Sequence, residues 1–279
     1  MLKNVLRRRG GLDLTMNVLI CLITVVFLFP LYWLFSSVFK PSASIVALPP
    51  QWWPHSPTLN NIVELFRVGG AKIWLFNSLF IAGATTLLVV IVSALAAYAF
   101  AKLRFPGRNA IFLIFISTLM LPKEVFIVPL FKVCQNLGLY GSYTGAILPN
   151  VALPFGVFLL KNFFDTIPDA LREAAKIDGA SEYRTFFRIV MPLAKPGIGA
   201  LAILMFVQTW NDYLWQLVML PRDSMRTIQI AIGAMQATDQ VDYGLRYAGA
   251  VLCALPMLVV FLIFQNYFAR GVTLGAVKE

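Results

Sequence analysis

The chain has 279 residues, of which 59% are apolar and 13% are charged, and its mean hydropathy is +0.77. Soluble globular proteins contain about 45–50% apolar and about 25% charged residues, so this composition excludes a disordered or collagen-like chain and is unusual for a cytosolic enzyme. The formal net charge of +10 at pH 7 is typical either of a nucleic-acid-binding protein or of a membrane protein with a basic cytoplasmic side. Since a spanning helix needs about 20 apolar residues, the length accommodates roughly six spans.

The first apolar run extends from about residue 14 to residue 39 and begins shortly after a basic N-terminal stretch. That stretch contains Lys3, Arg7, Arg8 and Arg9. Basic residues before an apolar run are also typical of a cleaved signal peptide, but this run is longer than the apolar core of such peptides. We therefore expect a spanning helix here.

A more polar, proline-rich segment, residues 40–72, follows the first run, and we expect it to form an extracytoplasmic loop. Trp52 and Trp53 in this loop are of a residue type that favours the membrane interface. His55, the single histidine of the chain, is expected to be an exposed residue of the same loop. One histidine cannot supply an HExxH metal site, and we expect the chain to bind no metal.

Five further apolar runs predict five more spans, and hence an all-α, polytopic membrane bundle of about six transmembrane helices. These runs cover about residues 73–101, 110–121, 143–160, 196–218 and 247–268. Pro122, Lys123 and Glu124 interrupt the third run. They predict either a kink or the outer end of that span, or else a pair of charges on a transport pathway.

The positions of Lys and Arg predict the orientation of the spans. Fifteen of the 23 basic residues fall in the segments 1–13, 102–109, 161–195 and 269–279. The remaining eight fall in the segments 40–72, 122–142 and 220–246. Because Lys and Arg accumulate on the cytoplasmic side, both termini and the 161–195 segment are predicted to be cytoplasmic. No soluble segment is long enough to fold as a nucleic-acid-binding domain, so the positive charge indicates topology.

The segment 165–195 is long and polar, and it is predicted to form two short helices. Pro168 suits the first helical position, Gly179 suits a helix C-terminus, and Ser181 can cap the second helix. Helical spacing predicts one face on each helix, formed by Leu171, Ala174, Ala175 and Asp178 and by Tyr183, Phe186, Phe187 and Val190. Such an amphipathic element either lies on lipid headgroups or docks into a soluble partner.

The spacing within this segment resembles the EAA motif of permease subunits of ATP-binding cassette importers. The residues that carry the resemblance are Glu173, Ala174, Ala175, Gly179, Ile189, Met191 and Pro192, with methionine where the family usually has leucine before the proline. The flanking residues 177–181 and 192–196 and the tail 270–278 resemble the carbohydrate-uptake branch of that family. Most of the chain resembles permeases of the maltose-transporter type with six spans.

The resemblance implies that residues 1–279 form a single transmembrane permease domain of the type I importer fold, with 165–195 as its cytoplasmic coupling loop. It implies contact with an ATPase subunit through Glu173, Ala174, Ala175, Asp178, Gly179 and Pro192, and through a tail that includes Gly275 and Lys278. It also implies a second homologous permease, two ATPase subunits, an extracytoplasmic solute-binding protein, and a bacterial or archaeal cytoplasmic membrane. The sequence contains no GxxxxGK[ST] phosphate-binding loop, so we expect partner subunits to use ATP, and this chain to bind no cofactor and to be no enzyme.

The function implied by the resemblance is movement of a sugar or oligosaccharide across the membrane by alternating access. A glycerol-phosphate-like substrate of the same transporter class stays open, and so do a polytopic membrane enzyme and a self-contained secondary carrier. A membrane enzyme needs a cluster of acid, base or metal-binding groups, whereas the dense carboxylates here fall on the coupling-loop pattern. A secondary carrier often has inverted repeats, and the sequence shows none.

Polar residues within spans are costly, so they provide candidates for the substrate path. At the outer end of the fifth predicted span these are Trp210, Asn211, Asp212 and Tyr213. Aromatic faces beside amide and carboxylate groups suit a sugar, and an interfacial aromatic belt is the alternative. Asn77 in the second span either lines the path or makes hydrogen bonds between helices.

Overall fold

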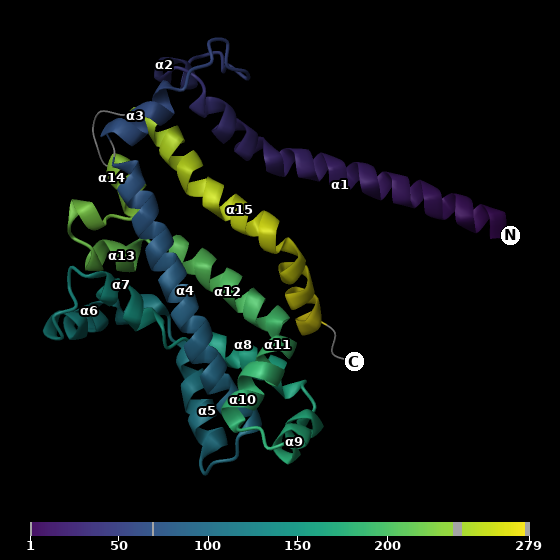
Figure 1. The fold of residues 1–279 in the computed structure, drawn as a ribbon. Coiled ribbons are helices and arrows are strands. Elements are labelled where there is room, and N and C mark those ends of the chain that lie inside the picture. The colour runs from purple at the N-terminus through teal and green to yellow at the C-terminus, as the bar shows by residue number, and fades with distance from the viewer. Residues whose placement is uncertain (1, 69, 237–241, 277–279) are drawn as a thin grey trace. The chain divides into compact units, whose positions relative to one another are not determined.

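The computed structural model describes the backbone of residues 2–68, 70–236 and 242–276, and the side chains of residues 15–67, 70–235 and 242–264 (Figure 1). Within these ranges the regular elements are helices only. The chain divides into two compact units, one formed by residues 1–71 and 234–254 and the other by residues 72–233 and 255–279. The all-α fold predicted from the sequence is confirmed for the described chain.

Three helices are long and apolar enough to cross a membrane without interruption. They are α1 (Leu2–Val38), α4 (Ala71–Lys102) and α15 (Tyr243–Ala276), with apolar parts at Thr15–Val38, Ala71–Lys102 and Tyr243–Phe264. Each coincides with a predicted span, because a continuous helix is the form in which an apolar segment satisfies all of its backbone hydrogen bonds within lipid.

Three further pairs of helices reach the length of a span only when the two parts of each pair are taken together across a sharp bend. The pairs are Arg108–Met120 with Lys123–Asn136, bent by 95°, Tyr143–Asn150 with Pro154–Asp165, bent by 47°, and Glu182–Leu193 with Lys195–Trp210, bent by 78°. Pro122, Pro154 and Pro196 lie at or just after the three breaks, and proline lacks the N–H that a continuing helix needs. The number of spans therefore agrees with the predicted six, as three unbroken helices and up to three broken ones. The third broken pair begins at Glu182, within the segment predicted to be cytoplasmic.

The broken pairs consist of short elements. The first contains α5 (Arg108–Ser117), η1 (Thr118–Met120), η2 (Lys123–Phe126) and α6 (Ile127–Asn136). The second contains α7 (Tyr143–Ile147), η3 (Leu148–Asn150) and α8 (Pro154–Asp165). The third contains α10 (Glu182–Thr185), a π-helical turn (Phe186–Val190), α11 (Met191–Leu193) and α12 (Lys195–Trp210). The remaining elements are α2 (Ser42–Ile45), α3 (Asn60–Val68), α9 (Asp169–Ile177), α13 (Leu214–Met219), η5 (Asp223–Met225) and α14 (Ile228–Gln236).

The predicted outer end of the fifth span is wrong. The apolar run to residue 218 predicts one helix, but α12 ends at Trp210 and α13 is a separate helix. Asn211 Nδ2 donates to the Val207 carbonyl at 2.9 Å, and Asp212 Oδ1 accepts from the Trp215 N–H at 3.2 Å. Short polar side chains that bond the backbone in this way compete with helical hydrogen bonds, which explains the interruption.

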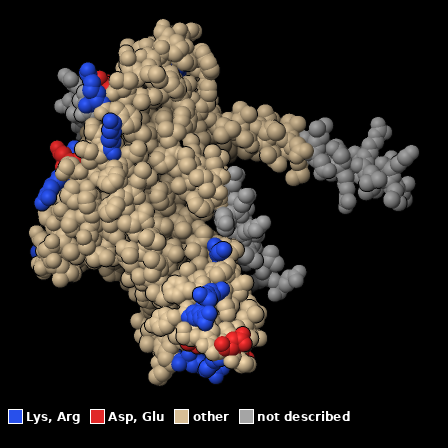
Figure 2. Space-filling model, in the orientation of Figure 1, with Lys and Arg blue, Asp and Glu red and all other residues tan. Residues whose placement is uncertain are grey.

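The second unit has its main core where α4, α8 and α12 pack together. Buried side chains such as Val89, Leu160 and Leu201 belong to one cluster there, and that cluster continues into the π-helical turn through Phe186. Gly156 of α8 permits the close approach to α4, because a Cβ at this position would lie 2.5 Å from Ser93 Oγ. Figure 2 shows charged side chains gathered over α9 and α10, whereas the apolar faces of the long helices carry few charges, as expected for surfaces that face lipid.

The first unit ties the end of α1 to the loop that follows it. Lys40 is fully buried; its Nζ donates to the Gln51 carbonyl at 2.6 Å and lies 4.1 Å from the centre of the Trp33 ring. Burial lowers the pKa of the Lys40 ammonium. His55 is exposed in this loop, as predicted, and Trp52 is exposed as well.

Candidate functional site

The 165–195 loop forms two helices joined by a glycine turn, as the sequence predicts. Helix α9 ends in a Schellman motif, in which the Gly179 N–H donates to the Lys176 carbonyl at 3.1 Å and the Ala180 N–H to the Ala175 carbonyl at 2.9 Å. Gly179 has φ +75°, a left-handed conformation that favours glycine. The turn is thus fixed by backbone geometry. The direction of the turn at Gly179 determines how the chain enters α10.

The caps of both helices follow the prediction within one residue. Ser181 Oγ accepts a hydrogen bond from the Arg184 N–H at 3.3 Å and so caps α10. Pro168 is the N-cap residue of α9, and Asp169 takes the first helical position that had been predicted for the proline. The difference is small, since Pro168 is extended at ψ 132° and only φ is fixed by its ring.

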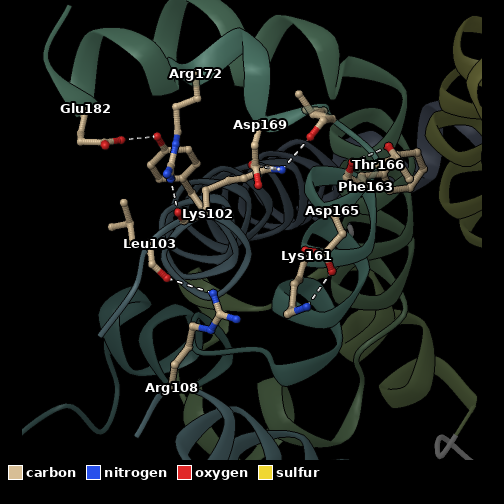
Figure 3. A network of polar contacts seen from close by, with 12 residues as sticks. Lys102, Leu103, Arg108, Lys161, Phe163, Asp165, Thr166, Asp169, Arg172 and Glu182 are labelled. Atoms are coloured by element: carbon tan, nitrogen blue, oxygen red, sulfur yellow. Dashed lines mark hydrogen bonds and ion pairs between the residues drawn. The ribbon is translucent and has the colours of Figure 1, made fainter. Parts of the chain in front are cut away.

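A network of polar contacts joins this loop to the end of α4, and we call it the α4 clasp (Figure 3). Its side chains are Tyr98, Lys102, Asp169, Arg172 and Glu182. Lys102 Nζ donates to the Ile167 carbonyl at 2.6 Å and to Asp169 Oδ1 at 2.8 Å. The Arg172 guanidinium donates to the Lys102 carbonyl, and Tyr98 Oη donates to Glu182 Oε2 at 2.6 Å.

The α4 clasp holds both α9 and α10 against one helix end. Lys102 is almost entirely buried, with 6% of its side chain exposed, whereas 64% of the Asp169 side chain is exposed. The Lys102 ammonium holds the pKa of the Asp169 carboxyl below its usual range, through a hydrogen bond and through its charge. The sequence assigned Lys102 only to a basic loop, because nothing in the chain order signals that residues 102 and 169 meet.

The motif residues do not all face the same way. Ala175 is buried, whereas Glu173, Ala174 and Asp178 are exposed, so the residues of the predicted α9 face differ in burial. Pro192 is also exposed. The most exposed large apolar side chain on α9 is Ile177, of which 86% is accessible.

The predicted face of the second helix is also divided. Phe186 and Val190 are buried, and Tyr183 and Phe187 are exposed. The reason is the π-helical turn over Phe186–Val190, because a π-turn takes more residues than an α-turn and shifts the side chains that follow. The sequence contains no periodic signal for this turn.

A cavity of about 530 Å³ lies where the breaks of the first two bent helix pairs and the end of α12 come together. Apolar residues form most of its lining, with Leu121, Phe126, Leu153 and Met205 among them. The polar residues of the lining are Thr118, Lys123, Asn150, Gln208, Thr209 and Asp212. Irregular backbone at membrane depth is tolerated where it is buried in protein or lines a cavity, which accounts for the position of the breaks.

An ion pair spans two of the segments that line this cavity. Lys123 Nζ lies 2.9 Å from Asp212 Oδ2, and the two residues are 89 positions apart in the chain. The kink predicted at Lys123 is confirmed by the 95° bend, whereas a place for this residue on a transport pathway stays a prediction. Its partner is Asp212 of the α12–α13 break and not the neighbouring Glu124, which is exposed.

The family of binding-protein-dependent transport system inner membrane components matches residues 90–274. This chain belongs to that family. The arabinooligosaccharides transport system permease protein AraQ of Bacillus subtilis is 36% identical over 260 residues, covering 92% of each chain. The sn-glycerol-3-phosphate transport system permease protein UgpE of Yersinia pestis is 36% identical over 274 residues, covering 95% of this chain and 98% of the relative.

The fold is that of a solved importer subunit. A chain from a bacterial ABC transporter involved in the import of the acidic polysaccharide alginate superposes with a TM-score of 0.82 at 22% sequence identity, over 93% of this chain and 97% of that one. The protein is accordingly the permease subunit of an ATP-binding cassette importer, and ATP hydrolysis belongs to a separate subunit. The resemblance stated from the 165–195 loop is confirmed.

The other predicted path residues of the permease lie outside the described lining of the cavity. Trp210 is 1% exposed, and its ring stacks on Phe206 with centroids 5.8 Å apart. Tyr213 packs against Gly233, where a Cβ would lie 2.8 Å from its ring. Asn211 Oδ1 accepts from Gln229 Nε2 at 3.3 Å. Of the four adjacent residues predicted at the end of α12, only Asp212 reaches the cavity.

Asn77 makes hydrogen bonds between segments of the permease, which was the alternative to a place on the path. Its Nδ2 donates to the carbonyls of Ser224 and Arg226, at 3.1 Å and 2.9 Å. Its Oδ1 accepts from Tyr143 Oη at 2.8 Å. These contacts use both N–H donors of the buried amide and one of the two acceptor positions of its oxygen, and a place for Asn77 on the substrate path stays a prediction.

Among the residues whose side chains are described, no group of three or more His, Cys, Asp or Glu is arranged to hold a metal ion. Two predicted contacts with an ATPase subunit fall in the tail. Lys278 lies outside the described residues, and Gly275 lies in a part of α15 of which only the backbone is described.

Proposed function

We propose that this permease moves a sugar or oligosaccharide across a bacterial or archaeal cytoplasmic membrane by alternating access. The observation that carries the proposal is the cavity at the helix breaks, where neutral polar groups and an ion pair stand among apolar side chains. Sugars present C–H faces and hydroxyl groups, so a mixed surface of this kind suits them. The transport of arabinooligosaccharides by the system to which AraQ belongs supports the same substrate class.

The second part of the proposal concerns the partners. One further permease, two ATPase subunits and an extracytoplasmic solute-binding protein would complete the transporter, with both termini of this chain in the cytoplasm. The excess of basic residues in the predicted cytoplasmic segments supports this orientation. ATP would be bound and hydrolysed by the partners alone. The family to which the chain belongs is defined by dependence on a binding protein, which supports that partner.

The 165–195 loop is the proposed contact with an ATPase subunit. Glu173, Ala174 and Asp178 are exposed there, together with the apolar side chain of Ile177. Exposed apolar side chains near small residues favour docking into a groove of a folded partner. The buried Ala175 instead permits α9 to pack closely on its own chain. Gly179 and Pro192 would set the path of the chain at the contact, and Gly275 and Lys278 would add the tail.

The α4 clasp supports the coupling role of this loop. A loop that transmits force needs a rigid attachment to the membrane helices, and Lys102, Asp169 and Arg172 supply one at the end of α4. The third bent pair continues from the loop into α12, which ends beside Asp212. A displacement of the loop would therefore reach the cavity through α12.

Co-purification from the native membrane tests the proposal. The full chain, carrying an affinity tag, should bring down two ATPase subunits and one further permease, and the purified complex should hydrolyse ATP. Transport activity by the purified single chain in liposomes would contradict the proposal and favour a secondary carrier.

A further inference from the structure

We propose that the Lys123–Asp212 ion pair makes the cavity electrically neutral and so selects neutral polyhydroxylated ligands over anionic ones. The proposal rests on the proposed function, since it takes the cavity to be part of the substrate path. It separates the sugar substrate from the glycerol-phosphate-like alternative, which the family alone leaves open. Asp212 is the specificity-determining residue in this scheme.

The charges of the cavity are few. Of its described lining residues, Lys123 and Asp212 are the charged ones, and the remaining polar members are threonine, asparagine and glutamine side chains. The pair joins the first bent helix pair, which contains Lys123, to the α12–α13 break, which contains Asp212, at 2.9 Å between Nζ and Oδ2. Glu124, beside Lys123, is exposed and lies outside the described lining. The formal charge presented to a ligand is therefore zero.

The carboxylate of the pair is held in place. Asp212 Oδ1 accepts from the Trp215 N–H at 3.2 Å, so one oxygen is fixed to the start of α13 while the other faces Lys123. Only 14% of the Asp212 side chain is exposed, against 41% for Lys123. An approaching anion cannot displace Asp212 without breaking both contacts. The negative charge consequently stays beside Lys123.

The electrostatic consequence differs between ligand classes. A phosphate or carboxylate that binds Lys123 must also approach the fixed Asp212 charge, and this repulsion is stronger in a partly apolar cavity than in water. A hydroxyl group both donates and accepts, so it can bind Asp212 as a donor and Lys123 as an acceptor without altering the charge balance. Rejection of an anion by a fixed like charge is a standard route to specificity.

The pair differs from an ordinary surface salt bridge. Lys161 and Asp165, at 2.6 Å, are four residues apart on α8, where such pairs contribute little beyond local helix stability. Lys123 and Asp212 come together only through the tertiary structure. Among the described residues, Lys123 Nζ donates a hydrogen bond to Asp212 alone. Two of the three N–H donors of the Lys123 ammonium therefore stay available for a ligand.

Four forms of the chain test the proposal, each purified in complex with its partner subunits and placed in lipid nanodiscs. They are the wild type, Asp212→Asn, Lys123→Gln and the double variant, which give the cavity formal charges of zero, plus one, minus one and zero. The probes are lactose and lactobionate, a neutral disaccharide and its carboxylate derivative. The quantity measured is the ratio of their dissociation constants.

We expect the wild type to bind lactose at least about tenfold more tightly than lactobionate, which corresponds to about 1.4 kcal/mol. Asp212→Asn should lower this preference at least about tenfold, Lys123→Gln should raise it, and the double variant should return to the wild-type ratio. The double variant is the matched control, because it removes both charges and restores neutrality. A ratio that is equal in all four forms would overturn the proposal.

A second measurement needs no sugar. Asn150, which lines the cavity, is changed to cysteine in a chain whose Cys21, Cys134 and Cys253 are replaced by alanine. The cysteine is then labelled with an anionic sulfonatoethyl or a cationic trimethylammonioethyl methanethiosulfonate. The ratio of anionic to cationic rates should rise about tenfold with Asp212→Asn and fall with Lys123→Gln.

The labelling rates separate failure of this proposal from failure of the proposed function. If the cysteine reacts and the rate ratio does not follow the charge, the selection by charge is wrong and the substrate path stands. If it reacts with neither reagent in any form, the cavity is closed to solutes and the proposed path itself is contradicted. If neither sugar binds to the wild type, the ratio of anionic to cationic labelling rates tests the selection by charge.

Discussion

Two lysine–aspartate pairs in the second unit join distant parts of the chain, and they are built in opposite ways. In the α4 clasp, Lys102 is buried and Asp169 is largely exposed. In the cavity, Asp212 is mostly buried and Lys123 is more exposed. Lys102 has a backbone carbonyl as an additional acceptor, whereas Lys123 has Asp212 alone among the described residues.

The difference indicates different roles. A buried lysine that bonds both a carbonyl and a carboxylate fixes the backbone around it, so the α4 clasp positions the 165–195 loop. A partly exposed lysine on a cavity wall retains donors for a ligand, so the second pair is suited to recognition. Variants of the loop should therefore change the binding of the ATPase subunit and leave the charge of the cavity unaltered.

Gly179→Val should produce the largest effect on the loop. A β-branched residue in the left-handed conformation costs roughly 1–2 kcal/mol and opens the Schellman turn, so the affinity for the ATPase subunit should fall by up to about thirtyfold. Gly179→Asn is the matched control, since asparagine tolerates this conformation, and it should retain most of the affinity. Equal affinities of the valine and asparagine variants, in a binding titration with purified subunits, would contradict the role of the turn.

Ile177→Ser should lower the same affinity about tenfold without changing the thermal unfolding of the permease. The side chain is 86% exposed in the chain alone, so its burial can stabilise only a complex. Leu137→Ser, at an exposed apolar residue just after α6, serves as the control and should leave the affinity unchanged. A fall in the unfolding temperature of the Ile177 variant would show that the residue stabilises the permease itself.

Lys102→Met should weaken the binding of the ATPase subunit about fivefold and lower the unfolding temperature. The change leaves the Ile167 carbonyl and Asp169 without their buried donor, a loss of about 1–3 kcal/mol. Lys161→Met, which removes the exposed pair with Asp165, should have little effect on either quantity. Both variants remove a lysine that pairs with an aspartate, but Lys102 is the more buried of the two. Similar changes in affinity and unfolding temperature for both variants would therefore argue against the α4 clasp.

Asp169→Asn should have the smallest effect, and one that depends on pH. The native pKa of Asp169 is lowered from 3.8, so the stabilisation is fully present above the unfolded pKa and is lost as pH falls through the lowered native value. The unfolding temperature of the wild type should exceed that of the variant at pH 7, and the difference should disappear in acid. The exposure of the carboxylate keeps this difference small. If the difference in unfolding temperature instead grew as the pH fell, the native pKa of Asp169 would not be lowered.

The sequence predicts the parts of this fold that depend on local pattern. The helices α1, α4 and α15 follow from unbroken apolar runs, and the Gly179 turn and the Ser181 cap follow from residue types with one dominant conformation. The motif around Glu173 was sufficient to predict the family. These features depend on residues within one continuous segment of the chain, or else on hydropathy alone.

The features that the sequence does not predict depend mainly on contacts between residues far apart in the chain. Lys123 and Asp212 are 89 residues apart and Lys102 and Asp169 are 67 apart, so neither pair has a signal in residue spacing. The end of α12 at Trp210 was missed because apolar residues continue beyond Asp212, and hydropathy does not register the hydrogen bonds that interrupt the helix. The π-helical turn at Phe186–Val190 likewise alters a face that regular spacing predicts.

Helix α12 connects the 165–195 loop at one end to the cavity at the other. Its 16 residues span roughly 24 Å at 1.5 Å per residue, and a bend of 78° separates it from the helical turns that precede it. A tilt of about 5° about Ala194 would move the far end by roughly 2 Å over that length. The distance between Lys123 and Asp212 is 2.9 Å, so such a movement is sufficient to separate the pair. The same small rotation of the loop would thereby move the two opposite charges apart, while their sum stays zero.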